Sequence, residues 1–148
     1  MKVLVVGSGG REHAIVEAIS RSPKASKIYA APGNAGIAAL AECVAIKDTD
    51  VEKLLEFAKA NEIDLTVVGP EASLAVGIVD RFREEGLKIF GPTKAAAQLE
   101  ASKDFAKRLM FKYDVPTAGY ETFTDFDAAL AYVKKGTLPT VLKSVNVS

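Results

Sequence analysis

VLVVGSGGREH, residues 3–13, decides the fold of this chain. Its apolar, β-branched beginning predicts a buried parallel strand. Three glycines follow within four positions, and the apolar residues of 14–19 predict a helix directly after them. Such a turn aims backbone N–H groups at an anion, and the helix dipole adds partial positive charge there. A phosphate bound by Gly9, Gly10 and Arg11 is therefore the first hypothesis; its plain alternative is a tight turn with a surface arginine.

The same turn differs from the dinucleotide-binding fingerprint G-x-G-x-x-G. Glu12 stands where the third glycine is required, and its charged side chain neither permits close helix packing nor favours a pyrophosphate. The fingerprint also has an acidic residue about 20 positions further on, at the end of the second strand. Here the predicted second strand, 27–31, runs into Pro-Gly-Asn-Ala-Gly at 32–36 without a carboxylate. An NAD- or FAD-binding oxidoreductase domain is therefore the weaker alternative.

Composition excludes several classes of protein. The chain has 148 residues, of which 49% are apolar, and its 19 Lys+Arg balance its 19 Asp+Glu, so no net charge draws it to nucleic acid or to a membrane. Its one cysteine, Cys43, excludes an internal disulfide and is predicted to be a buried thiol. No apolar run approaches the roughly 20 residues of a membrane span. The first strand begins too early for a signal peptide, so we expect a cytoplasmic protein.

Strands and helices alternate along the first part of the chain. Further strands are predicted at 42–46, 64–68 and 87–90, and helices at 51–58 and 75–82. This alternation predicts an α/β fold: an open parallel sheet with right-handed crossovers and flanking helices. In such sheets the ligand binds beyond the carboxyl ends of the strands. Glycine-containing loops follow four of the five predicted strands, at 7–10, 33–36, 69–71 and 91–92. The sequence therefore predicts a binding site at that edge.

The pattern changes near residue 101, so we expect one domain at 1–101 and a second unit at 102–148. Ser102 is predicted to cap a helix that extends to about Tyr113. The remaining elements are predicted as a strand, a helix and a strand, at 120–123, 124–133 and 139–143. Four apolar residues at helix spacing are predicted to be core: Phe105, Leu109, Phe126 and Leu130. Because so few elements do not readily bury their faces alone, we expect an incomplete domain.

Six short motifs occur in an order that resembles one enzyme family. They are GSGGREHA at 7–14, PGNAG at 32–36, GPEASLA at 69–75, FGPT at 90–93, QLEASK at 98–103 and VPTA at 115–118. Each motif is weak by itself. The ordered set resembles phosphoribosylamine–glycine ligase, the glycinamide ribonucleotide synthetase of purine biosynthesis. The resemblance covers residues 1–143, about the first third of such an enzyme.

The resemblance implies a ligase of the ATP-grasp superfamily. Members activate the carboxylate of glycine with ATP, and the amine of 5-phosphoribosylamine attacks the resulting acyl phosphate. Residues 1–101 would form a Rossmann-like N-terminal domain of the pre-ATP-grasp kind, and the rest would begin the ATP-grasp domain. Lys103 and Lys143 match lysines that contact ATP phosphates. ATP and Mg²⁺ (or Mn²⁺) would be the cofactors, with the metal ligands outside this chain, and no catalytic residue is assigned.

One departure from the family follows Lys143. The family continues there into a glycine-rich loop over the nucleotide phosphates, whereas Ser-Val-Asn-Val-Ser follows here at 144–148. Because backbone nests that bind phosphate depend on glycine, we expect this chain not to complete the reaction alone. The alternative of another class is a non-catalytic shortened product that associates with other subunits. A homo-oligomer and a companion chain both stay open.

The remaining candidates lie in the glycine-containing loops. Glu12 either contacts a ribose hydroxyl or an amine, or is a first-turn carboxylate that the helix dipole stabilises. Next to Gly33, Asn34 either reaches the ligand or is a turn residue. Glu71 either contacts the ligand or begins a helix. His13, the one histidine, is predicted to position or cap its neighbours rather than to act as a general base.

Overall fold

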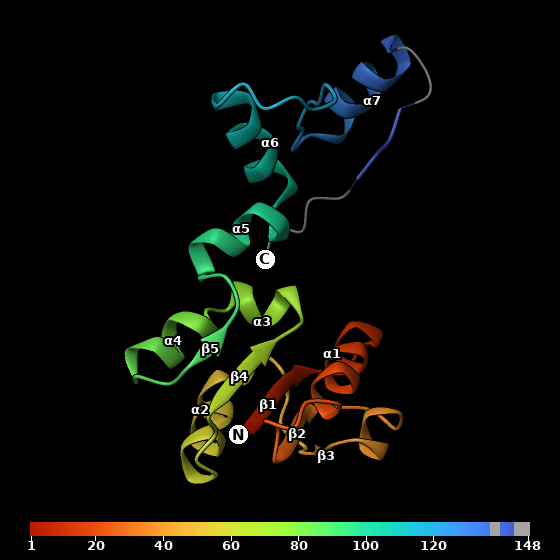
Figure 1. The fold of residues 1–148 in the computed structure, drawn as a ribbon. Coiled ribbons are helices and arrows are strands. Elements are labelled where there is room, and N and C mark those ends of the chain that lie inside the picture. The colour runs from red at the N-terminus through yellow and green to blue at the C-terminus, as the bar shows by residue number, and fades with distance from the viewer. Residues whose placement is uncertain (137–139, 144–148) are drawn as a thin grey trace. The chain divides into compact units, whose positions relative to one another are not determined.

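The computed structural model of the chain describes residues 1–136 and 140–143. The chain divides into two compact units, Met1–Ala97 and Gln98–Ser148. Within the described residues, the first unit contains a five-stranded parallel sheet in the order β3-β2-β1-β4-β5 (Figure 1). Its strands are β1 (Lys2–Gly7), β2 (Lys27–Pro32), β3 (Glu42–Cys43), β4 (Leu65–Val68) and β5 (Ile89–Phe90). The predicted α/β fold with an open parallel sheet is confirmed.

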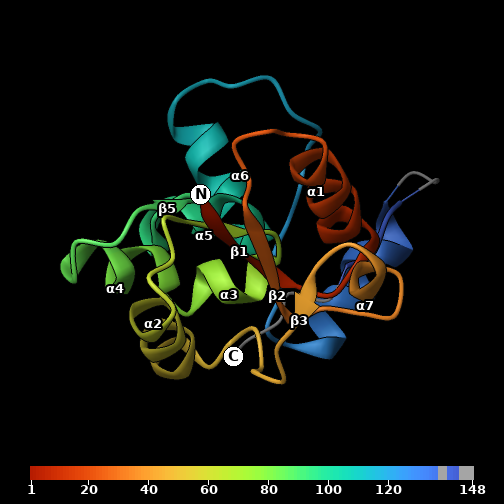
Figure 2. The same cartoon turned by 60° about the horizontal axis from the view of Figure 1, so that its bottom comes forward.

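Helices cover both faces of this sheet (Figures 1 and 2). The α1 helix (Gly10–Ser20) and the 3₁₀ turn η1 (Ile37–Ala39) lie on one face, and α2 (Val51–Ala60) and α4 (Ile78–Glu84) lie on the other. The central strand β1 alternates between the two layers, because successive side chains of a strand point to opposite faces. Leu4 and Val6 pack on the α2 and α4 side, and Val3 and Val5 pack on the α1 side.

The predicted helix at 75–82 is wrong as a single element. Two helices occupy this region, α3 (Glu71–Ala75) and α4, and Gly77 separates them with a φ of 94°. Glycine adopts this left-handed conformation without the strain that a side chain would cause. The backbone leaves the right-handed helix at this residue, and the helix is interrupted. Both helices still contribute to the core, through Leu74 and Phe82. The sequence pattern did not predict the next helix, α5 (Lys94–Ala101), which supplies Ala97 to the same core.

Strand β3 is shorter than the predicted strand at 42–46. It pairs with β2 through two residues only, at the edge of the sheet. The predicted burial of Cys43 is wrong: the residue is exposed at the edge of the sheet, outside any disulfide, and its thiol donates to the Asn34 carbonyl at 3.7 Å. An ion pair between Lys27 and Glu42, 2.7 Å long, joins β2 to this edge.

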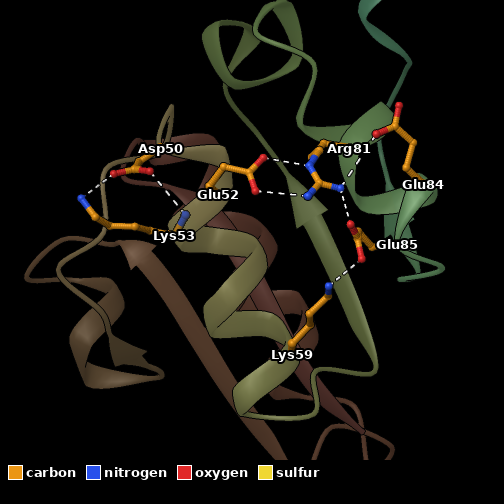
Figure 3. A network of polar contacts seen from close by, with 7 residues as sticks. All are labelled: Asp50, Glu52, Lys53, Lys59, Arg81, Glu84 and Glu85. Atoms are coloured by element: carbon orange, nitrogen blue, oxygen red, sulfur yellow. Dashed lines mark hydrogen bonds and ion pairs between the residues drawn. The ribbon is translucent and has the colours of Figure 1, made fainter.

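A network of charged side chains joins α2 to α4 (Figure 3). The Arg81 guanidinium donates to both carboxylate oxygens of Glu52, at 2.8 and 3.2 Å, and to Glu85, at 2.5 Å. Lys59 donates to the other oxygen of Glu85 at 2.6 Å. The ammonium of Lys59, followed by Arg81, lowers the pKa of the Glu85 carboxyl to about 2. Glu85 therefore stays ionised between its two cations far into acid.

In the second unit, side-chain caps set where the helices begin. Ser102 accepts a hydrogen bond from the Phe105 N–H at 3.2 Å at the start of α6 (Lys103–Lys112). Asp125 accepts one from Ala128 at 2.8 Å at the start of α7 (Phe126–Lys135). The cap predicted at Ser102 is thus present, and α7 begins close to its predicted start.

The predicted strands and core of this unit are wrong where the structure describes them. Residues 120–123 and 140–143 are not in strands, and Pro139 of the second predicted strand lies outside the described residues. Neither α6 nor α7 has a buried residue. Phe105, Phe126 and Leu130 are exposed and Leu109 is half-buried. An apolar helix face needs a second layer, and the described residues of this unit provide no sheet for it.

Candidate functional site

The loops that follow β1 and β2 are joined by hydrogen bonds at the carboxyl edge of the sheet. The N–H of Gly33 donates to the carbonyl of Gly7 at 3.1 Å. The side-chain amide of Asn34 donates to the carbonyl of Ser8 at 2.7 Å, and its oxygen accepts from the Ile37 N–H at 2.9 Å. Asn34 therefore fixes the shape of the glycine turn from the neighbouring loop.

His13 packs against this second loop. A Cβ atom on Gly36 would lie 2.6 Å from Cε1 of the imidazole, so the glycine leaves room for the ring. This contact fits the predicted positioning role of His13 and places the ring between α1 and the loop after β2.

Arg11 joins the loop after β1 to the loop after β4. Its Nη1 donates to the carbonyl of Gly69 at 2.8 Å, and its Nη2 donates to Oε1 of Glu71 at 3.1 Å. Both side chains are partly exposed, at 59% for Arg11 and 42% for Glu71. The guanidinium is thus oriented by a carbonyl and a carboxylate while part of it still faces solvent.

Glu12 is buried at the start of α1, with only 4% of its surface exposed. Its Oε2 accepts a hydrogen bond from the N–H of Gly9 at 2.6 Å, the reciprocal half of a capping box. Three glycines, Gly7, Gly9 and Gly69, surround the side chain, and we call them the glycine cradle. An added Cβ would lie 2.6 Å from Cγ of Glu12 at Gly7 and 2.0 Å from its Oε1 at Gly69. The carboxylate fits there only because these residues have no side chains.

These groups line a cavity of about 310 Å³, which we call the Arg11 pocket. It is lined by Gly9, Gly10, Arg11, Glu12, Pro70 and Glu71. The pocket lies between the ends of β1 and β4, where the chain order of the sheet reverses: β1 pairs with β2 on one side and with β4 on the other. Open α/β sheets bind ligands at this switch point. The first N–H groups of α1, from Gly10 onward, have no acceptor within the helix and favour an anion.

The pocket brings together five of the residues singled out in the sequence: Gly9, Gly10, Arg11, Glu12 and Glu71. Gly33 and Asn34 do not line the pocket; they lie in the neighbouring loop after β2 and hydrogen-bond to the glycine turn. Pro70 was missed, although its place between Gly69 and Glu71 in a strand-end loop could have indicated it. Lys103 and Lys143 are both exposed and belong to the second unit.

A larger cavity, of about 550 Å³, lies at the opposite edge of the sheet. It is lined by Ser26 before β2, by Ala38 and Leu40 of the η1 turn and its end, and by the paired charges of Lys27 and Glu42. The pKa of Lys27 is raised above its ordinary value, because its ammonium donates a hydrogen bond to the Glu42 carboxylate. Its charge is already neutralised, and the Arg11 pocket remains the better anion site.

In 1–136 and 140–143, no three His, Cys, Asp or Glu side chains gather as ligands of a metal ion would. Among the helices described, none is long and apolar enough to cross a bilayer.

Family models match the whole chain in two parts. Residues 1–100 match the model described as phosphoribosylglycinamide synthetase, N domain. Residues 101–148 match the one described as phosphoribosylglycinamide synthetase, ATP-grasp (A) domain.

Curated relatives at high identity are phosphoribosylamine–glycine ligases. The protein of Caldanaerobacter subterraneus is 56% identical over 144 residues, which are 97% of this chain and 34% of that protein. The protein of Pasteurella multocida is 55% identical over 146 residues, with the same coverage of 97% and 34%. The chain thus spans about a third of the length of the curated relatives that it matches.

Two solved structures are similar to this chain, one a phosphoribosylamine–glycine ligase and one a carboxylase domain. The crystal structure of phosphoribosylamine–glycine ligase from Thermotoga maritima matches with a TM-score of 0.60 at 35% identity, over 82% of this chain and 27% of that one. The biotin carboxylase domain of 2-oxoglutarate carboxylase from Hydrogenobacter thermophilus, solved with MgADP and bicarbonate, matches with a TM-score of 0.69 at 18% identity. This second match covers 93% of this chain and 33% of that one, and concerns the fold alone.

Proposed function

Because the chain belongs to the phosphoribosylglycinamide synthetase family, we propose that it supplies the substrate-phosphate part of an ATP-dependent ligase. The ligase would join glycine to 5-phosphoribosylamine through glycyl phosphate, in purine biosynthesis and in the cytoplasm. Residues 1–101 would hold the phosphorylated amine, and residues 102–148 would begin the ATP-grasp domain. The relatives named phosphoribosylamine–glycine ligase support the reaction, since the chain aligns with them over nearly its whole length.

One observation carries the proposal: an arginine and the start of a helix line a single pocket at the switch point of the sheet. We assign the phosphate of the substrate to the N–H of Gly10 and to the guanidinium of Arg11. Gly9 lines the pocket beside them, but its N–H already donates to Glu12. Arginine offers a planar fork of donors that matches a phosphate, and the helix dipole adds to its charge.

The other candidates take supporting positions in this proposal. Glu71 lies at the mouth of the pocket on the Arg11 guanidinium, where its carboxylate would accept from a ribose hydroxyl or from the amine. Gly33 and Asn34 would set the shape of the turn through their hydrogen bonds to the Gly7 and Ser8 carbonyls. Glu12 would face the ligand from the floor of the pocket.

ATP and a divalent cation, Mg²⁺ or Mn²⁺, are the cofactors that we propose for the complete ligase. The match to the ATP-grasp domain supports ATP, and the carboxylase structure with MgADP has the same fold. The exposed ammonium groups of Lys103 and Lys143 fit nucleotide phosphates as point charges. The described residues contain no carboxylate cluster that fits the cation, so its ligands would come from elsewhere in the ligase.

Calorimetric titration of the chain with ribose 5-phosphate tests the phosphate site. We expect saturable binding of one equivalent, with sub-millimolar or millimolar affinity that weakens as salt is raised. An absence of heat at millimolar ligand would contradict the assignment. So would an affinity for ribose 5-phosphate that stays unchanged when Arg11 is replaced.

Acylation of lysines tests the nucleotide part. We expect ATP to bind this chain poorly, so acylation of Lys103 and Lys143 should proceed at the same rate with and without MgATP. Exposed Lys134 serves as the internal control. Protection of the two candidates alone would show that 148 residues already hold the nucleotide.

A further inference from the structure

We propose that Glu12 decides which anions enter the Arg11 pocket: it admits a single phosphate and rejects a pyrophosphate. The location of the pocket rests on the proposed function, but the selection is a separate property. It concerns ligands that the same fold binds when the third glycine of the dinucleotide fingerprint is present.

The first step of the inference is the place of the carboxylate. In a dinucleotide site the pyrophosphate lies against the N-terminus of the first helix, and the third glycine leaves the space beneath that helix start empty, so that the helix packs closely on the strand. Here Glu12 stands at that glycine position, and its carboxylate occupies the space, with Oε2 2.6 Å from the N–H of Gly9. A donor that would face a bound anion is already paired with a residue of the chain.

The second step is that the carboxylate has a fixed position. It is 4% exposed, and the glycine cradle surrounds it from the ends of both β1 and β4. Added Cβ atoms at Gly9 and Gly69 would lie 2.8 and 2.0 Å from its two oxygens. An arriving ligand cannot displace the side chain by a simple rotation, because backbone surrounds it in the folded chain.

The third step is the balance of charge. Of the charged side chains that line the pocket, Arg11 supplies one positive charge, and Glu12 and Glu71 supply one negative charge each. Glu12 lies at the floor, and Glu71 lies at the mouth on the guanidinium. A single phosphate can pair with the guanidinium and the outer N–H groups of α1 while it stays away from the carboxylate. A second phosphoryl group would lie close to the carboxylate in a partly buried site. There the repulsion between the two negative charges lowers the affinity roughly tenfold or more.

Competition on the unmodified chain gives the first test. Ribose 5-phosphate is bound, and inorganic phosphate and pyrophosphate are added as competitors at constant ionic strength. We expect phosphate to compete at least tenfold better than pyrophosphate, although pyrophosphate carries more charge. Tighter binding of pyrophosphate than of phosphate is the ordinary result for a helix N-terminus beside an arginine, and it would overturn the proposal.

Variants give the second test. Glu12→Gln keeps the size of the side chain and removes its charge, and Glu12→Ala removes both. We expect each to gain at least tenfold in pyrophosphate affinity, measured by calorimetry. Glu17→Gln is the matched control, because Glu17 lies on the same helix with an exposed carboxylate paired to Arg21. We expect this control to keep the anion preference of the unmodified chain.

The outcomes separate the two claims. A lower melting temperature of the Glu12 variants without any gain in pyrophosphate affinity would reduce Glu12 to a helix cap and overturn the selection. An unmodified chain that binds no ribose 5-phosphate would contradict the proposed function. A gain of pyrophosphate binding in Glu12→Gln, measured directly by calorimetry, would still support the selection in that case.

Discussion

The guanidinium of Arg11 lies 3.1 Å from the carboxylate of Glu71, across the boundary between the loops that follow β1 and β4. The same guanidinium donates to the Gly69 carbonyl at 2.8 Å. Sixty residues of sequence separate the two side chains, so the fold alone brings them together. Their pairing orients the arginine toward the pocket before any ligand arrives.

Replacement of Arg11 should weaken the ligand and leave the fold intact. We expect Arg11→Gln to lower the affinity for ribose 5-phosphate by roughly tenfold or more, since a charged hydrogen bond contributes about 1.5–3 kcal/mol. Its melting temperature should change little, because exposed ion pairs contribute little to stability. Arg21→Gln is the matched control: Arg21 ends the same helix and pairs only with exposed Glu17 among the described residues. Equal affinities of the two variants would refute the role of Arg11.

The glycine cradle can be tested by a double-mutant cycle. Gly69→Ala would put a Cβ 2.0 Å from Oε1 of Glu12, and overpacking of this kind costs about 1–3 kcal/mol. In the background of Glu12→Ala the same change should cost much less, because the obstructing carboxylate is absent. Gly10→Ala, where an added Cβ meets nothing within 4 Å, serves as the control for stability. Additive free energies of unfolding in the cycle would show that Glu12 does not occupy the cradle.

The sequence predicted the parts of the fold that depend on short-range patterns. Short apolar runs between turns and helices predicted all five strands of the first unit. The ordered motifs indicated the family, which is confirmed by the family models and the curated relatives. The predicted lengths of the two edge strands were wrong. β3 and β5 have two residues each, because an edge strand has a partner on one side only. Gly77 interrupts a helix whose apolar spacing continues through it.

The sequence pattern did not predict contacts between residues that lie far apart in the chain. The position of Glu12 was indicated by the missing third glycine, but its enclosure by Gly69 depends on how β4 lies beside β1. The predicted core of the second unit failed for a related reason. Helix spacing identifies an apolar face, yet it does not say what that face packs against, and Phe126 is 76% exposed. The roles of the candidate site residues remain predictions.

The position of the core can be tested by replacing two phenylalanines, one buried and one exposed. Phe82 is fully buried between α4 and the sheet, and Phe111 of α6 is 77% exposed. We expect Phe82→Ala to lower the free energy of unfolding by about 3–5 kcal/mol. Phe111→Ala should change it by no more than about 0.5 kcal/mol, since it removes no buried contact. Urea denaturation followed by circular dichroism measures both, and a large loss in Phe111→Ala would place part of the core in the second unit.

Acid should weaken the α2–α4 network only at low pH. The pKa of Glu85 is lowered to about 2 from its ordinary 4.5, so its contribution is fully present above pH 4.5 and is lost as the pH falls toward 2. We expect Glu85→Gln to melt at a lower temperature at pH 7 and to show a shallower decline between pH 4.5 and 2. Glu84→Gln is the control, since the Glu84 carboxylate lies 3.9 Å from Arg81 and is 70% exposed. Parallel declines in all three proteins would exclude this role of Glu85.

The most direct test of the central claim is a crystal structure of the chain with ribose 5-phosphate. We predict phosphate oxygens within hydrogen-bond distance of the Gly10 N–H and of the Arg11 guanidinium, with the Glu12 carboxylate still in the glycine cradle and paired to the Gly9 N–H. A ligand bound elsewhere with the turn at residues 8–11 empty would contradict the account.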